Sequence, residues 1–289
     1  MSVYRKSRFS RREFLVLAGG TASAVVLGAC TSSAPVVTTV TPTIGLAPTP
    51  TEEVRSLIIT IVYNNIAHDA RLDTPWGFAA LIEYGDQQVL FDTGGDSPTL
   101  LGNMAILEKD PSTIQKVVLS HIHDDHVGGL RGLLETGVRP TVYVLPSFLR
   151  SFKDSVSKIT ELIEVAPGLE IAKGMFTTGE MPGPPAEQSL VVKSRGGLVV
   201  ITGCAHPGIV EIVRRAKELV NEPVFLAMGG FHLGDKRENQ IASILTSLRE
   251  LGVQRVAPSH CTGREAINMF ADEYGDKFIR SGAGTVITI

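Results

Sequence analysis

The feature that most constrains this chain is a cluster of metal-binding residue types in residues 117–129, "VVLSHIHDDHVGG". His121 and His123 are two positions apart, so in an extended chain both imidazoles face one side. Asp125 and His126 follow where the strand gives way to a loop, so their side chains can reach the same space. An ordinary polar loop explains the cluster poorly, because the chain holds only seven histidines in 289 residues. The cluster predicts a metal site at the C-terminal end of a buried strand, where α/β proteins place reactive groups.

The rest of the chain reads as a mixed α/β body of ordinary globular composition, with 43% hydrophobic and 20% charged residues. Alternating or β-branched stretches predict strands at 55–65, two within 77–95, 116–120, 141–146, 161–165, 169–172, two within 188–203, 223–230, 254–260 and 284–289. Helical spacing predicts helices at 97–110, with Ser97 as N-cap, and at 127–136, 208–220, 237–252 and 263–275. Hairpins dominate the first half and strand–helix alternation the second, which indicates a mixed sheet covered by helices. The stretch 150–185 is otherwise expected to be irregular.

The N-terminus has the pattern of an export signal. Residues 14–27 are apolar but shorter than the roughly 20 residues of a membrane-spanning helix, so they read as a signal h-region. Arg11-Arg12 in "SRREFL" resembles the twin-arginine signal of the bacterial Tat exporter, and "LGAC" resembles a lipobox that leaves Cys30 as a lipidated N-terminus. An uncleaved membrane anchor is the alternative. Both interpretations place an exported protein on the membrane, outside the cytoplasm, and the lipoprotein reading makes residues 1–30 the signal peptide.

A tether is predicted at residues 31–52, which are rich in Thr and Pro and almost free of charge, so the body spans 53–289. Residues 1–29 hold five basic residues and one acidic residue, so the remainder carries a formal net charge of −7 rather than −3. The body contains no long basic run. Nucleic acid is therefore not an expected partner, whereas a small-molecule substrate is. The sequence does not indicate the oligomeric state.

Three further histidines each follow an apolar strand in the C-terminal half: His206 in "ITGCAHPGI", His232 in "MGGFHLG" and His260 in "APSHCTG". This placement repeats that of the first cluster, so all three are expected to point into one cleft. His68 stands outside these motifs and either lines the pocket mouth with Trp76 or lies on the surface.

Two cysteines remain if Cys30 carries lipid. Cys204 and Cys261 both lie beside histidines. In an oxidising compartment they either pair or take part in metal chemistry, and the sequence leaves both possibilities open.

The spacing His-x-His-x-Asp-His resembles the metallo-β-lactamase superfamily. That resemblance implies a four-layer αββα sandwich of two mixed β-sheets with outer helices. "LFDTG" (90–94) is similar to a segment of that family in which the aspartate, Asp92 here, supports the ligands; otherwise Asp92 is a turn carboxylate bonded to backbone amides. "TGCAHPGI", "GGFHL" and "PSHCTG" together resemble a narrower branch, named for dihydropterin-ribofuranosyl-aminobenzene-phosphate synthase, over roughly 57–289.

The resemblance implies two metal positions, with His121, His123 and His206 around the first and Asp125, His126 and His260 around the second. Two features depart from the commoner family pattern. No histidine lies between 126 and 206, where the third ligand usually falls, and Cys204 stands where a bridging aspartate is usual. Cys204 is then either a bridging thiolate or a small buried side chain. His232 is expected to contact substrate or transfer a proton unless local backbone satisfies it, and Cys261 is expected to be structural.

Neutral imidazoles with a carboxylate suit one or two Zn²⁺ ions, with Mn²⁺ or Fe possible. The resemblance implies hydrolysis, because His123 stands where the family's iron-dependent branch has glutamate. Zinc lowers the pKa of bound water to about 7. We therefore expect a metal-dependent hydrolase whose metal-bound hydroxide attacks an ester, lactone, amide or phosphoester, with Asp125 orienting the nucleophile and His232 protonating the leaving group. The alternative is a non-catalytic or weakly active lipid-tethered binding protein on the same fold.

Overall fold

The computed structural model describes residues 56–289. The predicted signal peptide, the predicted tether and the first three residues of the predicted body lie outside these described residues. Within the described part of the chain, no helix combines the length and the apolar character needed to cross a bilayer.

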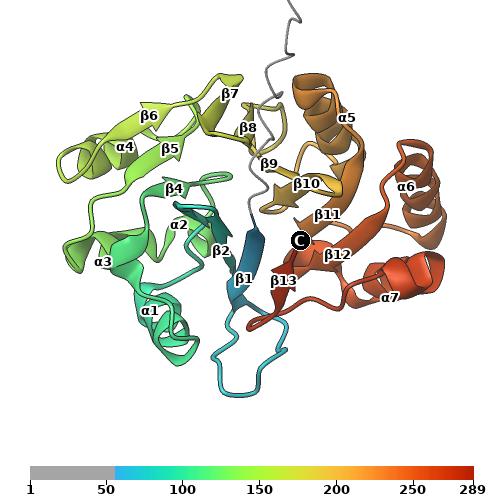
Figure 1. Ribbon diagram of the computed structural model, residues 1–289, viewed down its shortest axis with the longest axis horizontal. Coiled ribbons are helices and arrows are strands. Elements are labelled where there is room, and N and C mark those ends of the chain that lie inside the picture. Colours follow the sequence, from blue (N-terminus) through green and yellow to red (C-terminus); the bar gives the residue numbers. More distant parts are fainter. Residues whose placement is uncertain (1–55) are drawn as a thin grey trace, which may run out of the picture. The chain divides into compact units, whose positions relative to one another are not determined.

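Two β-sheets form the centre of the molecule (Figure 1). The seven-stranded sheet has the order β13-β1-β2-β3-β4-β5-β6, and the six-stranded sheet has the order β12-β11-β10-β9-β8-β7. The strands of the first sheet are β1 (Leu57–Asn64), β2 (Phe78–Tyr84), β3 (Gln87–Phe91), β4 (Lys116–Val118), β5 (Thr141–Val144), β6 (Leu162–Glu164) and β13 (Val286–Thr288). Those of the second sheet are β7 (Pro167–Ala172), β8 (Met175–Gly179), β9 (Leu190–Ser194), β10 (Gly197–Thr202), β11 (Val224–Gly230) and β12 (Arg255–Ser259).

Helices connect many of these strands. The α-helices are α1 (Ser97–Ile106), α2 (Asp124–Val127), α3 (Leu130–Glu135), α4 (Arg150–Ser157), α5 (Ile209–Val220), α6 (Glu238–Glu250) and α7 (Arg264–Tyr274). Three short 3₁₀ helices are η1 (Pro111–Thr113), η2 (His260–Thr262) and η3 (Gly275–Lys277).

Both sheets are mixed. β1, β2 and β3 form antiparallel hairpins, but β3, β4, β5 and β6 pair in parallel. The expectation that hairpins dominate the first half therefore holds only for its first three strands. In the second sheet β7 to β10 are antiparallel, and β10, β11 and β12 are parallel. Parallel strands end at the same edge of a sheet, so the loops that follow β3, β4, β10, β11 and β12 can meet.

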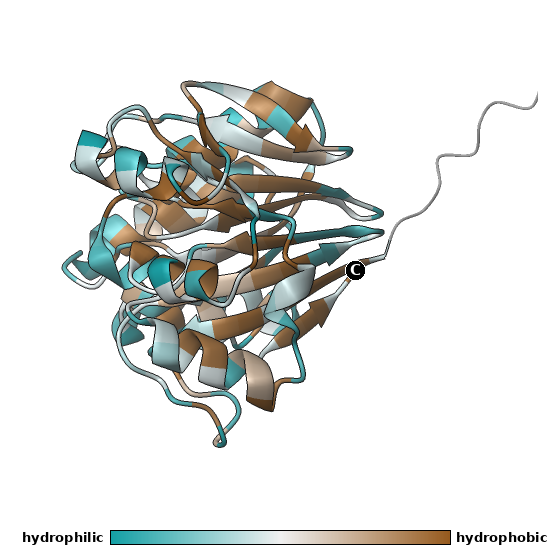
Figure 2. Cartoon of the chain, turned by 90° about the vertical axis from the view of Figure 1, so that its left-hand side faces the viewer, coloured by the Kyte–Doolittle hydropathy of each residue, from teal (hydrophilic) through white to brown (hydrophobic). Residues whose placement is uncertain are grey.

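Three apolar layers hold the sandwich together. The central layer lies between the sheets and includes fully buried side chains from both, such as Phe91 and Met228. α1 and α3 pack on the outer face of the first sheet, through side chains such as Leu100 and Leu133. α5, α6 and α7 cover the second sheet, and Phe270 of α7 is one of the buried side chains of this layer. Figure 2 shows the apolar strands inside and the polar outward faces of the helices. This arrangement confirms the predicted αββα sandwich of two mixed sheets.

The structure differs from the sequence-based elements in three places. α4 and β8 occupy the stretch expected to be irregular; α4 has only eight residues and buries only Val156, so its sequence signal is short. α1 begins after Asp96, whose carboxylate accepts the Thr99 N–H at 2.8 Å, so Ser97 is the first helical residue rather than the N-cap. Asp125 and His126 lie in the single turn of α2 rather than in a loop.

Candidate metal centre

The first cluster is positioned by a buried carboxylate at the end of β3. Asp92, with a φ of 59°, accepts the Ser120 backbone N–H at 2.7 Å and the Ser120 hydroxyl at 2.8 Å. Its second oxygen also lies 2.7 Å from His126 Nδ1. Asp92 thus joins the loop after β4 to helix α2, which is the supporting position that the sequence resemblance implied for it.

One group of possible ligands is formed by His121, His123 and His206, whose ring nitrogens lie within 4.8 Å of one another. His121 Nε2 and His123 Nδ1 are 3.2 Å apart. The His206 ring centroid lies 4.8 Å from that of His121 and 5.2 Å from that of His123. His121 is fully buried and His123 is exposed, so the group is open on one side. These are the three residues predicted for the first metal position.

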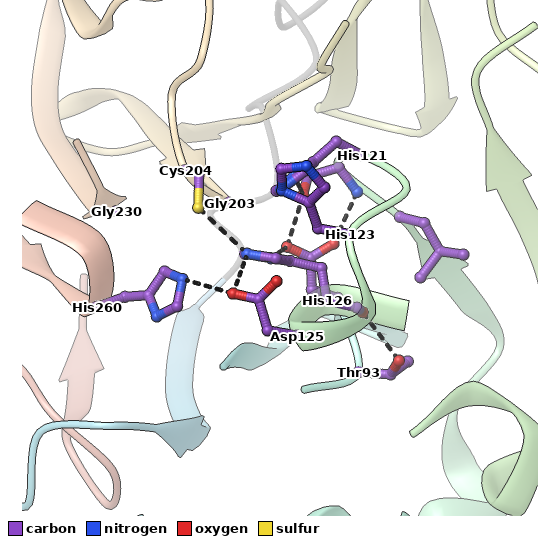
Figure 3. Close-up of polar contacts among 12 residues, drawn as sticks. Thr93, His121, His123, Asp125, His126, Gly203, Cys204, Gly230 and His260 are labelled. Atoms are coloured by element: carbon purple, nitrogen blue, oxygen red, sulfur yellow. Dashed lines mark hydrogen bonds and ion pairs between the residues drawn. The ribbon is translucent and has the colours of Figure 1, made fainter. Parts of the chain in front are cut away.

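A second group consists of Asp125, His126, Cys204 and His260, with one ligand atom from each within the same 4.8 Å limit. Asp125 Oδ2 lies 3.5 Å from His126 Nε2 and 3.4 Å from His260 Nε2. Cys204 Sγ lies 3.3 Å from His126 Nε2 (Figure 3). Cys204 also groups with His206 and His232. Its thiol therefore stands between the two positions, as a bridging ligand would.

Each buried histidine of the two groups has one ring nitrogen held away from the centre. His121 Nδ1 lies 2.9 Å from the Ser120 hydroxyl, and His126 Nδ1 bonds Asp92. The opposite nitrogens, Nε2, face the centre. Hydrogen bonds of this kind select the tautomer and orientation of metal-binding histidines in proteins.

His260 gives the clearest test of whether these residues fit a metal. Its Nδ1 lies 2.7 Å from Asn65 Oδ1, while Asn65 Nδ2 donates to the His260 carbonyl at 3.3 Å. The amide orientation makes Nδ1 the protonated nitrogen, so Nε2 carries a lone pair. His260 Nε2 and His206 Nε2 are both buried without a hydrogen-bond partner. A buried acceptor without a partner is costly, and a cation at each position would satisfy it.

The pKa values of the buried histidines differ between the two groups. Burial, reinforced by the neighbouring His126 and His206, lowers the pKa of His121 far below its ordinary value. Burial also lowers the pKa of His206 to about 4, with His232 the next contributor. His121 and His206 therefore offer neutral imidazoles. Burial alone would lower the pKa of His126 as well, but Asp92 and Asp125 raise it to about 10. The second group thus attracts positive charge, and a divalent ion there would compete with a proton.

The remaining histidines separate clearly. His232, with a φ of 51°, has its ring centroid 4.5 Å from that of His206, so it lies at the edge of the first group. The neighbouring Cys204 thiol and, after it, the His232 side chain lower the pKa of the Cys261 thiol below its ordinary value. Cys261, expected to be structural, therefore lies beside the site, and neither cysteine forms a disulfide. His68 is exposed and belongs to neither group.

Sequence reasoning missed one carboxylate that shapes the site. Glu187 is fully buried and accepts the backbone N–H groups of residues 203, 204, 205 and 206 at 2.8–3.1 Å. Burial raises the pKa of Glu187 to about 7, although these hydrogen bonds oppose the rise. The side chain holds the loop that carries Cys204 and His206. Glu187 precedes β9 as a single charged residue, so the sequence offered no signal that would have identified it.

The αββα sandwich and the two adjoining groups of possible ligands, at the C-terminal ends of strands, together indicate a protein of a metal-binding class. The family model of the metallo-beta-lactamase superfamily matches residues 77–260, which span both groups. The chain belongs to this superfamily.

Individual relatives agree with this assignment. The chain is 27% identical over 281 residues to the 7,8-dihydropterin-6-methyl-4-(beta-D-ribofuranosyl)-aminobenzene-5'-phosphate synthase of Methanocaldococcus jannaschii, covering 80% of this chain and 95% of the synthase. A solved structure described as a metal-dependent hydrolase of the beta-lactamase superfamily superposes with a TM-score of 0.69 at 28% identity, over 81% of this chain and 99% of the other. The metallo-beta-lactamase fold protein YhfI of Bacillus subtilis shares the fold, with a TM-score of 0.61 at 14% identity, over 81% of this chain and 99% of YhfI.

Proposed function

We propose that this protein is a zinc-dependent hydrolase that acts on an ester, lactone, amide or phosphoester of a small molecule. The observation that carries the proposal is the pair of donor groups that share one edge of the sandwich, with buried Nε2 atoms that have no other partner. Three nitrogens in one group, and nitrogen, oxygen and sulfur in the other, suit zinc better than magnesium or calcium, with manganese or iron as the next candidates. When bound, such ions acidify water and polarise a carbonyl or phosphoryl oxygen.

The protein's own residues have separate roles in this proposal. His121, His123 and His206 hold one ion, and Asp125, His126 and His260 hold the other, with Cys204 between them. Asp125 is partly exposed, so its free oxygen can orient the attacking water. His232 lies beside His206, where it can give a proton to the leaving group.

The substrate class is drawn from two sources. The hydrolase of known structure supports hydrolysis, and the synthase from Methanocaldococcus jannaschii supports a phosphorylated, ring-containing substrate.

We also propose that the protein is exported as a lipoprotein, on the grounds of Arg11-Arg12 and Cys30. Export favours hydrolysis of a molecule met outside the cytoplasm over an internal biosynthetic step.

Metal analysis combined with turnover tests the proposal. The purified protein should hold two zinc ions and hydrolyse a generic phosphodiester or lactone. His121→Ala and Asp125→Ala should each lose an ion and most of the activity, whereas His68→Ala, which changes an exposed histidine outside the site, should match the wild type. Full metal occupancy in both site variants would reject the ligand assignment. Two bound ions without turnover across a panel of esters, lactones and phosphodiesters would favour a binding protein instead.

A further inference from the structure

A cavity of about 560 Å³ opens beside the second donor group. It lies between the loop after β1, the start of α7 and the segment before β13. His260 lines one side, so the cavity adjoins a predicted metal ligand directly. Its volume falls within the roughly 300–1,000 Å³ of sites that bind small molecules. Substrate held there would present its reacting bond to the metal centre.

One wall of this cavity is an exposed aromatic ring. Trp76 is 58% exposed, and its ring centroid lies 4.9 Å from that of His260. A side chain this exposed contributes little to the packing of the core. Its position beside a buried histidine therefore suggests contact with a ligand. Indole rings stack on flat, unsaturated groups. Together with Ile267 and Phe278, which also line the cavity, Trp76 suits a ring.

The charges in the cavity have one sign. Arg264 and Arg280 line it, and no carboxylate is among its described lining residues. Both arginines are exposed, and neither has an ion pair or hydrogen bond within residues 56–289. By contrast, exposed Arg131 pairs with Glu135 at 2.8 Å. Two unpaired guanidinium groups in a chain whose residues 30–289 carry a formal net charge of −7 mark this cavity as a place for an anion.

A second, independent observation points the same way. Ser281 is 4% exposed and lines the cavity, yet its hydroxyl has no hydrogen-bond partner. The first turn of the 11-residue helix α7 also borders the cavity, through Gly263 and Arg264. Gly263 has no side chain to cap the helix, so the N–H groups of that turn remain available. Arginine, hydroxyl and helix N–H donors together are typical of phosphate sites.

We propose that this cavity binds the phosphate-bearing end of an aromatic substrate. Arg264, Arg280 and Ser281 contact the phosphate, and Trp76 stacks on the ring. The inference rests on the proposed function, since it assigns a binding place to the phosphorylated, ring-containing substrate proposed for the same centre. None of these four residues belongs to either metal-binding group.

The test uses Trp76 as its reporter, because it is the single tryptophan of the chain. Phenylphosphonate, which contains no ester bond to hydrolyse, is titrated into the metal-loaded protein while tryptophan emission is followed. A saturable change is expected, with weaker binding of inorganic phosphate and of benzoate. Arg264→Gln and Arg280→Gln should each weaken phenylphosphonate binding roughly tenfold or more, because a charge-assisted hydrogen bond is lost. Ser281→Ala should weaken it less.

Arg195→Gln is the matched control, since Arg195 is an exposed arginine at the β9–β10 turn, at the opposite end of β10 from the metal centre. It should bind phenylphosphonate as the wild type does. Metal content is measured in every variant and should be unchanged. Wild-type affinity in the Arg264→Gln/Arg280→Gln double variant would overturn the proposal, because it would place the phosphonate on the ions. The absence of any saturable change in the wild type would overturn it as well.

The two proposals fail in different ways. Arginine-dependent binding of phenylphosphonate without turnover of any ester by the wild type would leave the cavity assignment standing and reject the hydrolase. Turnover of a neutral ester such as phenyl acetate by the wild type, with arginine-independent phosphonate binding, would do the reverse.

Discussion

At the scale of single residues, Asp92 contributes most to the second metal position, although its own side chain does not face the ion. Its two oxygens receive three hydrogen bonds, and one of these fixes the ring of His126. An amide of the same shape keeps the volume but removes the charge and turns one acceptor into a donor. The ring of His126 would then lose the partner that aims Nε2 at the centre.

Asp92→Asn should therefore weaken metal binding at the second group by roughly 10–100-fold, the usual effect of removing a ligand's supporting partner. Competition with a chromophoric chelator measures the two affinities separately. The first group should change much less. Asp154→Asn on the exposed face of α4 is the control and should behave as the wild type. Equal loss at both positions would contradict this assignment of Asp92.

The sequence was most informative at this scale. All seven residues predicted as ligands fall in the two donor groups, because each lies in a short motif directly after an apolar strand. Asn65 and Glu187 were missed, although one orients His260 and the other holds the loop of residues 203–206. Their roles arise from folding, which brings them to residues far away in the chain, such as the 195 positions that separate Asn65 from His260.

At the scale of elements, the metal centre depends on strand ends with unusual backbone geometry. Asp92, Ala205, His232 and His260 all have positive φ angles, although none is glycine. Each lies just after the end of a strand, in a loop that carries or supports residues of the two donor groups. Such conformations cost of order 1–3 kcal/mol and persist where surrounding contacts impose them. Here the buried Glu187 supplies such contacts for the loop that contains Ala205.

Glu187→Gln should release this loop. The amide oxygen can still accept some of the four N–H groups, but its NH₂ group would face donors, so a destabilisation of about 1–3 kcal/mol is expected. Urea unfolding measures the change, and metal analysis should show reduced occupancy at the position that includes His206. Glu180→Gln is the comparison, because Glu180 accepts one exposed backbone N–H and should change stability by less than about 0.5 kcal/mol. Unaltered stability and metal content in Glu187→Gln would refute the role given to this carboxylate.

Helix α2 packs closely against the loop after β3. A Cβ added to Gly128 would lie 2.1 Å from the backbone oxygen of Gly95, so the helix that carries Asp125 and His126 would have to move. Gly128→Ala should destabilise the fold by roughly 1–3 kcal/mol and reduce metal binding at the second group. Gly102→Ala in α1, where the new methyl group meets nothing within 4 Å, should instead stabilise by up to about 1 kcal/mol. Urea unfolding of both variants decides, and the same sign for both would contradict the packing argument.

The sequence predicted most strands and helices, but it did not predict helix α4 or the direction in which some strands pair. β11, for example, begins with five consecutive apolar residues, so its burial could be predicted. α4 escaped because it lies against the sheet edge with a single buried residue. The parallel pairing of β3 to β6 escaped because strand direction depends on the crossover connections, which local sequence patterns do not report.

At the scale of the whole molecule, the donor groups join both sheets. His121 and Asp125 follow β4 in the first sheet, whereas Cys204, His206 and His260 follow strands of the second. A bound ion therefore links the two halves of the sandwich, and ion binding requires both halves to be folded. Ligands that bind only the folded state stabilise it by mass action.

Metal removal should therefore lower thermal stability. At ion concentrations 100-fold above the dissociation constant, each site contributes about 2.7 kcal/mol, and a domain of this size loses roughly 2–4 °C per kcal/mol. Differential scanning calorimetry with and without a chelator measures the shift. His68→Ala should show the full shift, while His260→Ala should show a smaller one. A melting temperature that is independent of chelator would argue against ions that bridge the sheets.

The two ends of the body lie together. Leu57 at the start of β1 and Ile289 at the end of the chain exchange two backbone hydrogen bonds of 3.2 and 2.9 Å. β1 then runs seven residues, roughly 23 Å at about 3.3 Å per residue, before Asn64 reaches the Ser259 hydroxyl next to His260. Whatever is attached ahead of Leu57, a lipid anchor or a purification tag, therefore joins the molecule at the rear of the sandwich. A body immobilised through that end would be held by the end of β1 that lies farthest from His260 and the second donor group.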